Sequence, residues 1–365
     1  MAFIRKTGTM DFSRRDILRY SAATASVLTL CEATGMPVAH AESAFTVATT
    51  AGSWGEGIKQ AFVTKPDFET ATKTKVNFLL EANPAAIASR LVAQPASPPA
   101  SAFDLLDLQY ALAADAGALM DYDLDIVKNY ADIAPSAQFE PRAGLKNWGA
   151  NMTMPIISLV WNTKLASKPA SMEDLWNPKY KAKVGLPDFG WYGHTWLHAL
   201  NKTLGGTEDN TDKAIAAIKD LVKKNEAVLL QNQEQALRAF TTEQIVLMPY
   251  WNGRTFELQS KGVPVDIEYV QGTIQLHNGF VLPKATVFKE LANRFVNNTL
   301  DPVLQLEMTQ RFRYPPSNTK AKLPPDLAPY AIPQGIAPKV VSLDWQKINE
   351  GRARDLQRWN KEIFG

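Results

Sequence analysis

Residues 171–188 read SMEDLWNPKYKAKVGLPD, and this stretch decides how the middle of the chain folds. Ser171 opens a short predicted helix as its N-cap, and Asp174, three residues later, completes a capping box. Asn177-Pro178 ends that helix, because the residue before a proline is disfavoured in the helical conformation. A lysine-rich segment follows, and Val184-Gly185-Leu186 then begins a short apolar strand.

That strand leads into Asp188-Phe189-Gly190-Trp191-Tyr192-Gly193, where two adjacent large aromatic residues lie between glycines. One interpretation is an ordinary strand-to-helix connection with a buried aromatic pair. The other is a rigid strand end that presents a loop to a ligand. The local pattern leaves both open, so the choice depends on the rest of the chain.

The composition is that of a globular protein whose charges balance. The chain has 365 residues, 45% of them hydrophobic and 21% charged, and this length predicts about two domains. The net charge is +2, but five of the 39 basic and three of the 37 acidic residues lie in the first 41 positions, so the remainder is neutral. A neutral protein has no general attraction to polyanions, and we expect neither nucleic acid nor a membrane surface as partner.

The first 41 residues have the pattern of an export signal. Ser13-Arg14-Arg15-Asp16-Ile17-Leu18 fits the twin-arginine consensus, an apolar run over 20–31 follows, and Ala39-His40-Ala41 provides a small-x-small cleavage site. We therefore expect cleavage after Ala41 and a periplasmic protein. Cys31 is the only cysteine, so the mature chain has none to mispair in an oxidising compartment. A basic amphipathic helix of a cytosolic protein is the alternative for this segment.

Beyond the leader, predicted strands and helices alternate. This order predicts an α/β fold with mostly parallel sheets flanked by helices. The continuous apolar run 155–161 is long enough to be a buried strand that crosses between two lobes, and the predicted strand 274–282 resembles a return crossing. We predict the first lobe at 42–153 and 279–365, and the second at 154–278. A proline-rich strap over 313–338 and an amphipathic helix over 343–363 complete the chain.

Polar and aromatic residues follow the predicted strands, and ligands of such sheets bind beyond the carboxyl ends of the strands. Aromatic faces stack on ligands and attract cations, with about 0.5–2 kcal/mol for each contact. Glu56 could pair with an amine, and Arg254 with a carboxylate or phosphate. Core packing is the alternative for any one aromatic, but core aromatics should lie within strands. The candidate ligand-binding residues are Ser53, Trp54, Glu56, Gln109, Tyr110, Trp191, Tyr192, Trp251, Asn252, Arg254, His277 and Asn278.

Signals for catalysis or a metal are weak. His194 and His198 are four residues apart on a predicted helix and share one face. The sequence shows neither a third ligand nor the intervening glutamate of zinc proteases, so we expect one surface and one packed histidine, and no metal. Nucleophile-elbow, phosphate-loop and dinucleotide motifs are missing, and no acid pair forms a recognisable dyad. We expect no cofactor, no catalytic residue and no enzyme; a twin-arginine-exported enzyme is the alternative.

Four segments resemble the periplasmic solute-binding subunits of bacterial ABC importers, in the group with the spermidine/putrescine binders. These segments are 171–184, Tyr250-Trp251-Asn252-Gly253 with 261–266, 279–285 with the helix after it, and Tyr314-Pro315-Pro316-Ser317-Asn318. The resemblance runs through most of the mature chain in the expected order. It implies two α/β lobes of the type II arrangement that close on a small ligand, and delivery to a permease in the inner membrane. We expect the protein to act as a monomer.

The charge of the ligand stays open. Trp54, Glu56 and Trp251 suit a polyamine, which binds between aromatics and acids. In the second lobe, however, Asp188 is the only acid of its loop, Asn252 is neutral, and His277-Asn278 occupies a position where the resemblance implies an acid. A polyamine or related amine, a small organic anion and a zwitterion therefore remain candidates. The adjacent tyrosine pair of iron binders is missing, which disfavours ferric iron.

Overall fold

The computed structural model describes residues 44–332 and 334–364. The leader predicted at 1–41 lies outside this part of the chain, and the structure described here belongs to one compact unit, Phe45–Gly365. Among the described residues, no helix combines the length and apolarity that crossing a membrane requires.

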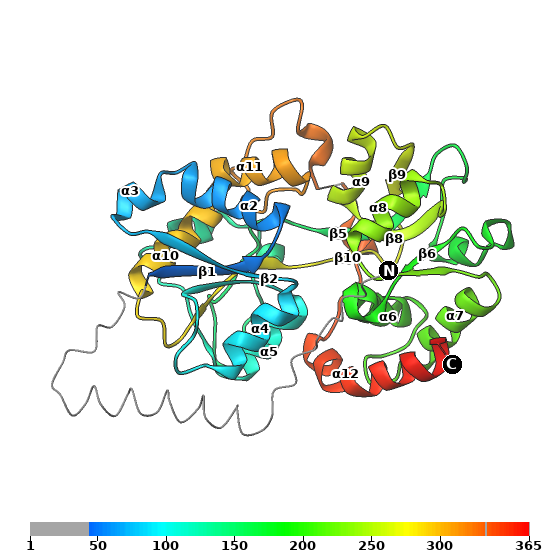
Figure 1. The fold of residues 1–365 in the computed structure, drawn as a ribbon, viewed down its shortest axis with the longest axis horizontal. Helices are drawn as coiled ribbons and strands as arrows, with labels where there is room; N and C mark the ends of the chain where they lie inside the picture. The colour runs from blue at the N-terminus through cyan, green and yellow to red at the C-terminus, as the bar shows by residue number, and fades with distance from the viewer. Residues whose placement is uncertain (1–43, 333, 365) are drawn as a thin grey trace, which may run out of the picture. The chain divides into compact units, whose positions relative to one another are not determined.

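The first sheet has five strands in the order β2-β1-β3-β11-β4, of which β1 and β2 are labelled in Figure 1. Side chains alternate between the two faces of a strand, and those of β1 do so here. Phe45 and Val47 pack with helices α2, α10 and α11, whereas Ala48 packs with α4 and α5 on the other face. The elements are β1 (Phe45–Thr50), α2 (Ser53–Lys59), η1 (Gln60–Thr64), α3 (Phe68–Thr72), β2 (Val76–Glu81), α4 (Pro84–Ala93), β3 (Ala102–Leu106), α5 (Asp107–Asp115), β4 (Leu119–Met120), β11 (Asn278–Pro283), α10 (Lys289–Thr299) and α11 (Pro302–Phe312).

The second sheet is built around β5. This strand pairs with β8, β9 and β10, and a bridge from Val184 to Leu247 connects β8 to the β6–β7 pair. Its elements are β5 (Ile156–Asn162), β6 (Gly185–Pro187), α6 (His194–Thr203), α7 (Asp212–Lys223), β7 (Val228–Leu230), α8 (Gln233–Thr241), β8 (Leu247–Trp251), α9 (Asn252–Ser260), β9 (Val265–Glu268) and β10 (Ile274–Gln275).

The prediction of mostly parallel sheets is correct for part of the fold. β1 is parallel to β2 and β3, and β6 is parallel to β7. In contrast, β5 is antiparallel to all three of its partners, and β11 is antiparallel to β3 and β4. Both strands follow a crossing from the other lobe. β5 and β11 each begin beside the C-terminal end of a neighbouring strand, β8 and β3 respectively, and are therefore antiparallel to that neighbour.

Local predictions in the middle of the chain are partly confirmed. The capping box of Ser171 and Asp174 is present, although the helix that it caps is a 3₁₀ helix, Met172–Trp176. The glycine-flanked aromatic stretch is a π-helical segment, Phe189–Gly193, that continues into α6, and is not an open loop. The predicted strand over 274–282 is divided into β10 and β11. Further short helical segments are Lys128–Asp132, Pro135–Ala137, Pro178–Tyr180, Ala328–Tyr330, Ala337–Lys339 and Asn360–Phe364.

The C-terminal segment connects the two lobes a third time. Residues 313–344 lead from α11 to α12 (Trp345–Trp359), shown in red in Figure 1. Trp359 and Ile363 belong to the hydrophobic core of the second sheet and its helices. Asn349 of α12 also donates a hydrogen bond to the Leu108 carbonyl of α5 at 3.0 Å. The predicted lobe limits place 279–365 in the first lobe alone, and they remain a prediction. α12 differs from that assignment, because it packs against the second lobe and also contacts the first.

Candidate functional site

Asp104 is a buried carboxylate that was not among the predicted site residues. It lies on β3 and accepts hydrogen bonds from Thr49 Oγ1 at 2.7 Å, Trp54 Nε1 at 2.7 Å and Asn278 Nδ2 at 2.8 Å. Burial raises the pKa of the Asp104 carboxyl from 3.8 to about 6, against the three hydrogen bonds that lower it. A carboxylate has about four acceptor positions, so three donors leave about one position for a further partner.

The candidate residue Trp54 owes its place to the turn after β1. Gly52 has φ 81°, a left-handed conformation that favours glycine, and it lets the chain pass from β1 directly into α2. Trp54 is half-buried, and its ring centroid lies 4.8 Å from that of Phe312 and 6.2 Å from that of Tyr314. Phe312 and Tyr314 come from the far end of the sequence and were not among the predicted site residues. The resemblance of 314–318 was the only signal that pointed to this segment.

A second carboxylate, Asp107, begins α5 and holds the crossing between β10 and β11. It accepts from the His277 backbone N–H at 2.6 Å and from the Tyr110 hydroxyl at 2.8 Å, and it lies 2.7 Å from His277 Nδ1. The other ring nitrogen, Nε2, lies 3.1 Å from the Ser136 carbonyl oxygen. Burial, the largest single influence, lowers the pKa of His277, but the charge of Asp107 and the hydrogen bonds to Asp107 and Ser136 together outweigh it, so the net pKa is above the usual value. Both ring nitrogens face acceptors, which suits an imidazolium.

Three aromatic residues of the second lobe pack together. The Trp251 ring centroid lies 5.5 Å from that of Trp191 and 4.4 Å from that of Tyr192. Tyr192 is buried and donates its hydroxyl to the Pro249 carbonyl at 2.5 Å, which makes it a supporting residue. Trp191 and Trp251 are half-buried, and Trp251 packs against the hydrophobic cores of both sheets.

Arg254 lies one turn into α9 and is already paired. Its Nη1 is 2.9 Å from Glu257 Oε2, and its guanidinium lies 5.8 Å from the ring centroid of Phe312. Because Glu257 balances its charge, Arg254 repels a cationic ligand less than an unpaired arginine would. The charge of this side chain therefore excludes neither an amine nor an anion.

The other candidates have different surroundings. Ser53 and Glu56 are exposed, and Glu56 of α2 accepts from Nε2 of Gln60, the first residue of η1, at 2.7 Å. Asn252 is buried, and its Oδ1 accepts from the Ile156 N–H at 3.1 Å, so that it secures the start of β5. Tyr110 is buried against Phe139, with ring centroids 4.1 Å apart. Asn252 and Tyr110 are thus built into the scaffold.

Two oxygen acceptors near the carboxylates have no hydrogen-bond partner within the described chain. They are Asn278 Oδ1, on the residue that bonds Asp104, and Gln109 Oε1, two positions after Asp107. A buried polar atom without a partner costs about 1–3 kcal/mol, so such atoms mark places where a ligand or a water completes the bonding. Both are acceptors, and an ammonium group supplies donors.

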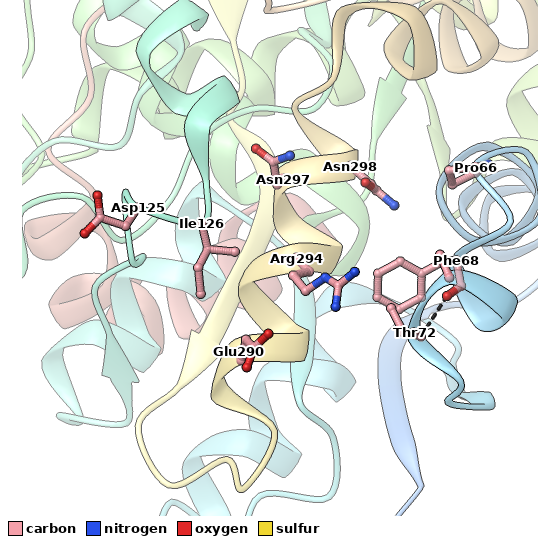
Figure 2. A pocket seen from close by; sticks show the side chains of 10 residues that line it. Pro66, Phe68, Thr72, Asp125, Ile126, Glu290, Arg294, Asn297 and Asn298 are labelled. Carbon is pink, nitrogen blue, oxygen red and sulfur yellow. Dashed lines mark hydrogen bonds between the residues drawn. The ribbon is translucent and has the colours of Figure 1, made fainter.

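A cavity of about 490 Å³ lies elsewhere in the first lobe. Figure 2 shows the Arg294 side chain extending from α10 on the side of Phe68, with Asp125 and Ile126 opposite. None of the twelve candidate residues lines this cavity, and it is therefore separate from the strand ends at which we place the ligand.

Both histidines of α6 are buried, so the prediction of one surface histidine is wrong. His194 and His198 meet Asp355 of α12, and the three side chains are grouped closely enough to hold a metal ion. Asp355 lies 157 positions after His198, so no local sequence pattern links it to the two histidines.

Comparisons with known proteins agree with this architecture. Residues 65–334 match the model of a family described as bacterial extracellular solute-binding protein. The spermidine/putrescine-binding periplasmic protein of Salmonella typhimurium is 29% identical over 163 residues, which are 43% of this chain and 46% of that protein. Spermidine/putrescine-binding periplasmic protein 1 of Haemophilus influenzae is 26% identical over 171 residues, 46% of this chain and 47% of the relative. The chain thus spans about half the length of the curated relatives that it matches.

Solved structures share the fold at low sequence identity. A crystal structure of an ABC transporter from Clostridium perfringens has a TM-score of 0.72 at 19% identity and covers 87% of this chain and 99% of its own. An ABC transporter substrate-binding protein from Bradyrhizobium japonicum has a TM-score of 0.70 at 18% identity, with 87% and 99% covered. These neighbours confirm the predicted two-lobed α/β fold. The matched family and the neighbours are substrate-binding proteins and not enzymes.

Proposed function

Because the chain belongs to the bacterial extracellular solute-binding protein family, we propose that it captures a small solute between its two lobes and delivers it to an ABC permease in the inner membrane. The twin-arginine leader, cleaved after Ala41, would carry the folded protein to the periplasm, where it acts as a monomer. A ligand that contacts both lobes shifts the equilibrium toward the closed arrangement, by as much as it binds the closed arrangement more tightly than the open one.

A polyamine or related amine is the solute class that the site supports best. The observation that carries this proposal is the buried carboxylate Asp104, whose hydrogen-bond donors Thr49, Trp54 and Asn278 are all neutral. Asp104 supplies negative charge that the sequence alone did not reveal, whereas the charge of Asp107 is balanced by His277. The curated relatives named for spermidine and putrescine support the same class.

We assign the candidate residues four kinds of role in this binding. Trp54, Trp191 and Trp251 would stack on the ligand, since all three are half-buried aromatics at strand-to-helix junctions. Asn278 and Gln109 would accept hydrogen bonds from ammonium groups through their unpartnered oxygens. Tyr110, Tyr192 and Asn252 would hold these groups in position, and Ser53 and Glu56 would line the exposed rim.

A small organic anion or a zwitterion is the second candidate. Arg254 and His277 favour it, because a guanidinium and an imidazolium both bind carboxylates. Arg254 would have to exchange Glu257 for the ligand, at the cost of an ion pair with a 2.9 Å separation. That exchange is why we place this candidate second.

A thermal-shift screen separates the two classes. The purified mature protein is heated with spermidine and putrescine in one arm, and with dicarboxylates and amino acids in the other. Binding to the folded state raises Tm by mass action, so we expect polyamines to raise it in a concentration-dependent manner. If only acids or zwitterions raise Tm, the polyamine assignment is wrong. If neither class does, the assignment of ligand-binding residues must be revised.

A further inference from the structure

We propose that His194, His198 and Asp355 form a binding site for one divalent transition-metal ion of the Zn²⁺ type. The site lies apart from the proposed ligand-binding residues and would attach the C-terminal helix α12 to α6. Three side chains from two distant segments supply the ligands, and all three are buried, with 2%, 0% and 0% of their surfaces exposed.

The positions of the ligand atoms fit such an ion. His198 Nε2 lies 2.9 Å and His194 Nε2 3.4 Å from the same oxygen, Asp355 Oδ2. Ligand atoms of all three residues lie within 4.8 Å of one another. Zinc binds nitrogen and oxygen at about 2.0–2.2 Å, so two neighbouring ligands of a tetrahedral site are about 3.4 Å apart. The three side chains therefore need only small movements to share one ion.

The types of ligand restrict the choice of metal. Two imidazoles and one carboxylate suit Zn²⁺ and its neighbours in the first transition row, whereas Ca²⁺ and Mg²⁺ prefer oxygen ligands throughout. Two histidines four residues apart on one helix face are a recurring zinc arrangement, and Asp355 adds the third ligand that the sequence did not reveal.

The surroundings of Asp355 resemble the outer shell of a metal site. Its second oxygen, Oδ1, accepts from Arg354 Nε at 3.0 Å and from Thr211 Oγ1 at 3.3 Å, which orients Oδ2 toward the two histidines. Hydrogen bonds of this kind to a ligating carboxylate set its direction. His198 Nδ1 is buried without a hydrogen-bond partner in the described chain, so the protein does not fix the His198 tautomer through that atom.

Arg352 opposes metal binding and thereby provides a test. Its Nη1 lies 2.9 Å from His194 Nδ1, where a guanidinium can only donate. The proton of His194 must then be on Nε2, the atom that a metal would take. Metal binding moves that proton to Nδ1 and displaces Arg352, a half-buried side chain whose guanidinium lies 5.3 Å from the Phe189 ring. Removing the Arg352 guanidinium should therefore tighten metal binding.

The experiment uses the mature protein, prepared without a histidine tag and stripped of metal with a chelator. Titration calorimetry with zinc sulfate measures the stoichiometry, and Tm is recorded with and without zinc. We expect one Zn²⁺ per chain and a higher Tm. H198Q and D355N should lose stoichiometric binding, and H277Q, the matched control outside the cluster, should keep it. R352A should bind zinc more tightly than the wild type.

Two results would overturn the proposal: no stoichiometric zinc in the wild type, or equal zinc binding by the wild type and H198Q. In either case the cluster is a hydrogen-bonded network only, and R352A leaves zinc binding unchanged.

If D355N or H198Q fails to fold, the wild type is titrated with Co²⁺ in place of Zn²⁺. Visible absorption typical of four-coordinate cobalt then supports the site, and its absence rejects it. Solute binding is measured separately, so failure of the solute proposal does not alter this outcome.

Discussion

Trp54 donates its indole N–H to the Asp104 carboxylate across 2.7 Å, although the two residues are 50 positions apart in the sequence. The parallel pairing of β1 with β3 brings them together, because Trp54 follows the end of β1 and Asp104 lies on β3. A buried acid thus orients the aromatic side chain that we assign to ligand stacking. Both the orientation of Trp54 and the ionisation of Asp104 depend on this contact.

Replacing Trp54 by Phe keeps an aromatic ring and removes the donor. The buried carboxylate then loses one of its three hydrogen bonds, and we expect a loss of about 1–3 kcal/mol in the free energy of unfolding and weaker solute binding. Urea unfolding and calorimetry measure the two effects. Trp176→Phe is the matched control, since it removes an indole bond to the Ala217 carbonyl at 3.0 Å and should leave solute affinity unchanged. An unaltered stability of Trp54→Phe would contradict the role of this bond.

The buried Asp104 should make stability depend on pH in a defined direction. Its pKa is about 6 when folded and 3.8 when unfolded, so between these values the folded state binds more protons. Stability from this group is therefore highest below pH 4 and falls as pH rises to 6, by about 3 kcal/mol in total. Asp104→Asn removes the effect. The unfolding free energies of the wild type and the variant are measured at pH 4 and pH 7, and at each pH the variant's value is subtracted from the wild type's, so that contributions of groups common to both cancel. If this difference rises from pH 4 to pH 7, the assignment to Asp104 is contradicted.

Removing the Trp251 side chain should affect both binding and folding. Trp251→Ala should abolish detectable solute binding, because it deletes an aromatic ring that we assign to ligand stacking, and it should lower stability because the same ring packs against both hydrophobic cores. The ring is half-buried, so the cost in stability should be about 1–3 kcal/mol, below the 3–5 kcal/mol of a fully buried tryptophan. Calorimetry and urea unfolding check the two results. Retained binding by a folded Trp251→Ala protein would exclude Trp251 from the site.

Gly253 lies where the C-terminal segment meets α9. A Cβ at this position would come within 2.4 Å of the Phe312 carbonyl oxygen and 2.6 Å of the Tyr314 ring. Gly253→Ala should therefore displace residues 312–314 and lower the free energy of unfolding by about 1–3 kcal/mol. Gly190→Ala is the control, because its nearest neighbour is the Asp188 side chain at 3.6 Å. Equal stabilities of the two variants would show that 312–314 adjust without cost.

Loss of the capping box should be measurable at Ser171, which is not among the candidate ligand-binding residues. Ser171→Ala removes the side chain that accepts from the third residue of the 3₁₀ helix. We expect a loss of about 0.5–2 kcal/mol and no change in solute affinity. Ser171→Asp, which restores an acceptor, should recover most of the loss. Equal destabilisation by the Asp variant would point to packing instead of capping.

Local features of this protein could be predicted without the structure: the capping box at Ser171, the alternation of strands and helices, and the positions of Trp54 and Trp251 at strand-to-helix junctions. These features depend on residues a few positions apart, whose spacing the sequence displays directly. The order of the four resembling segments also indicated the family to which the chain belongs.

Which charged groups are buried, and which side chains they contact, became clear from the three-dimensional fold alone. Asp104 looked like one acid among many until β1, β3 and β11 placed Thr49, Trp54 and Asn278 around it. Asp355 gained a possible role only when α12 packed on α6, against two histidines at least 157 positions away. The physical reason is that desolvation and hydrogen bonding depend on every neighbour in space, and those neighbours come from segments whose order along the chain says little about their contacts.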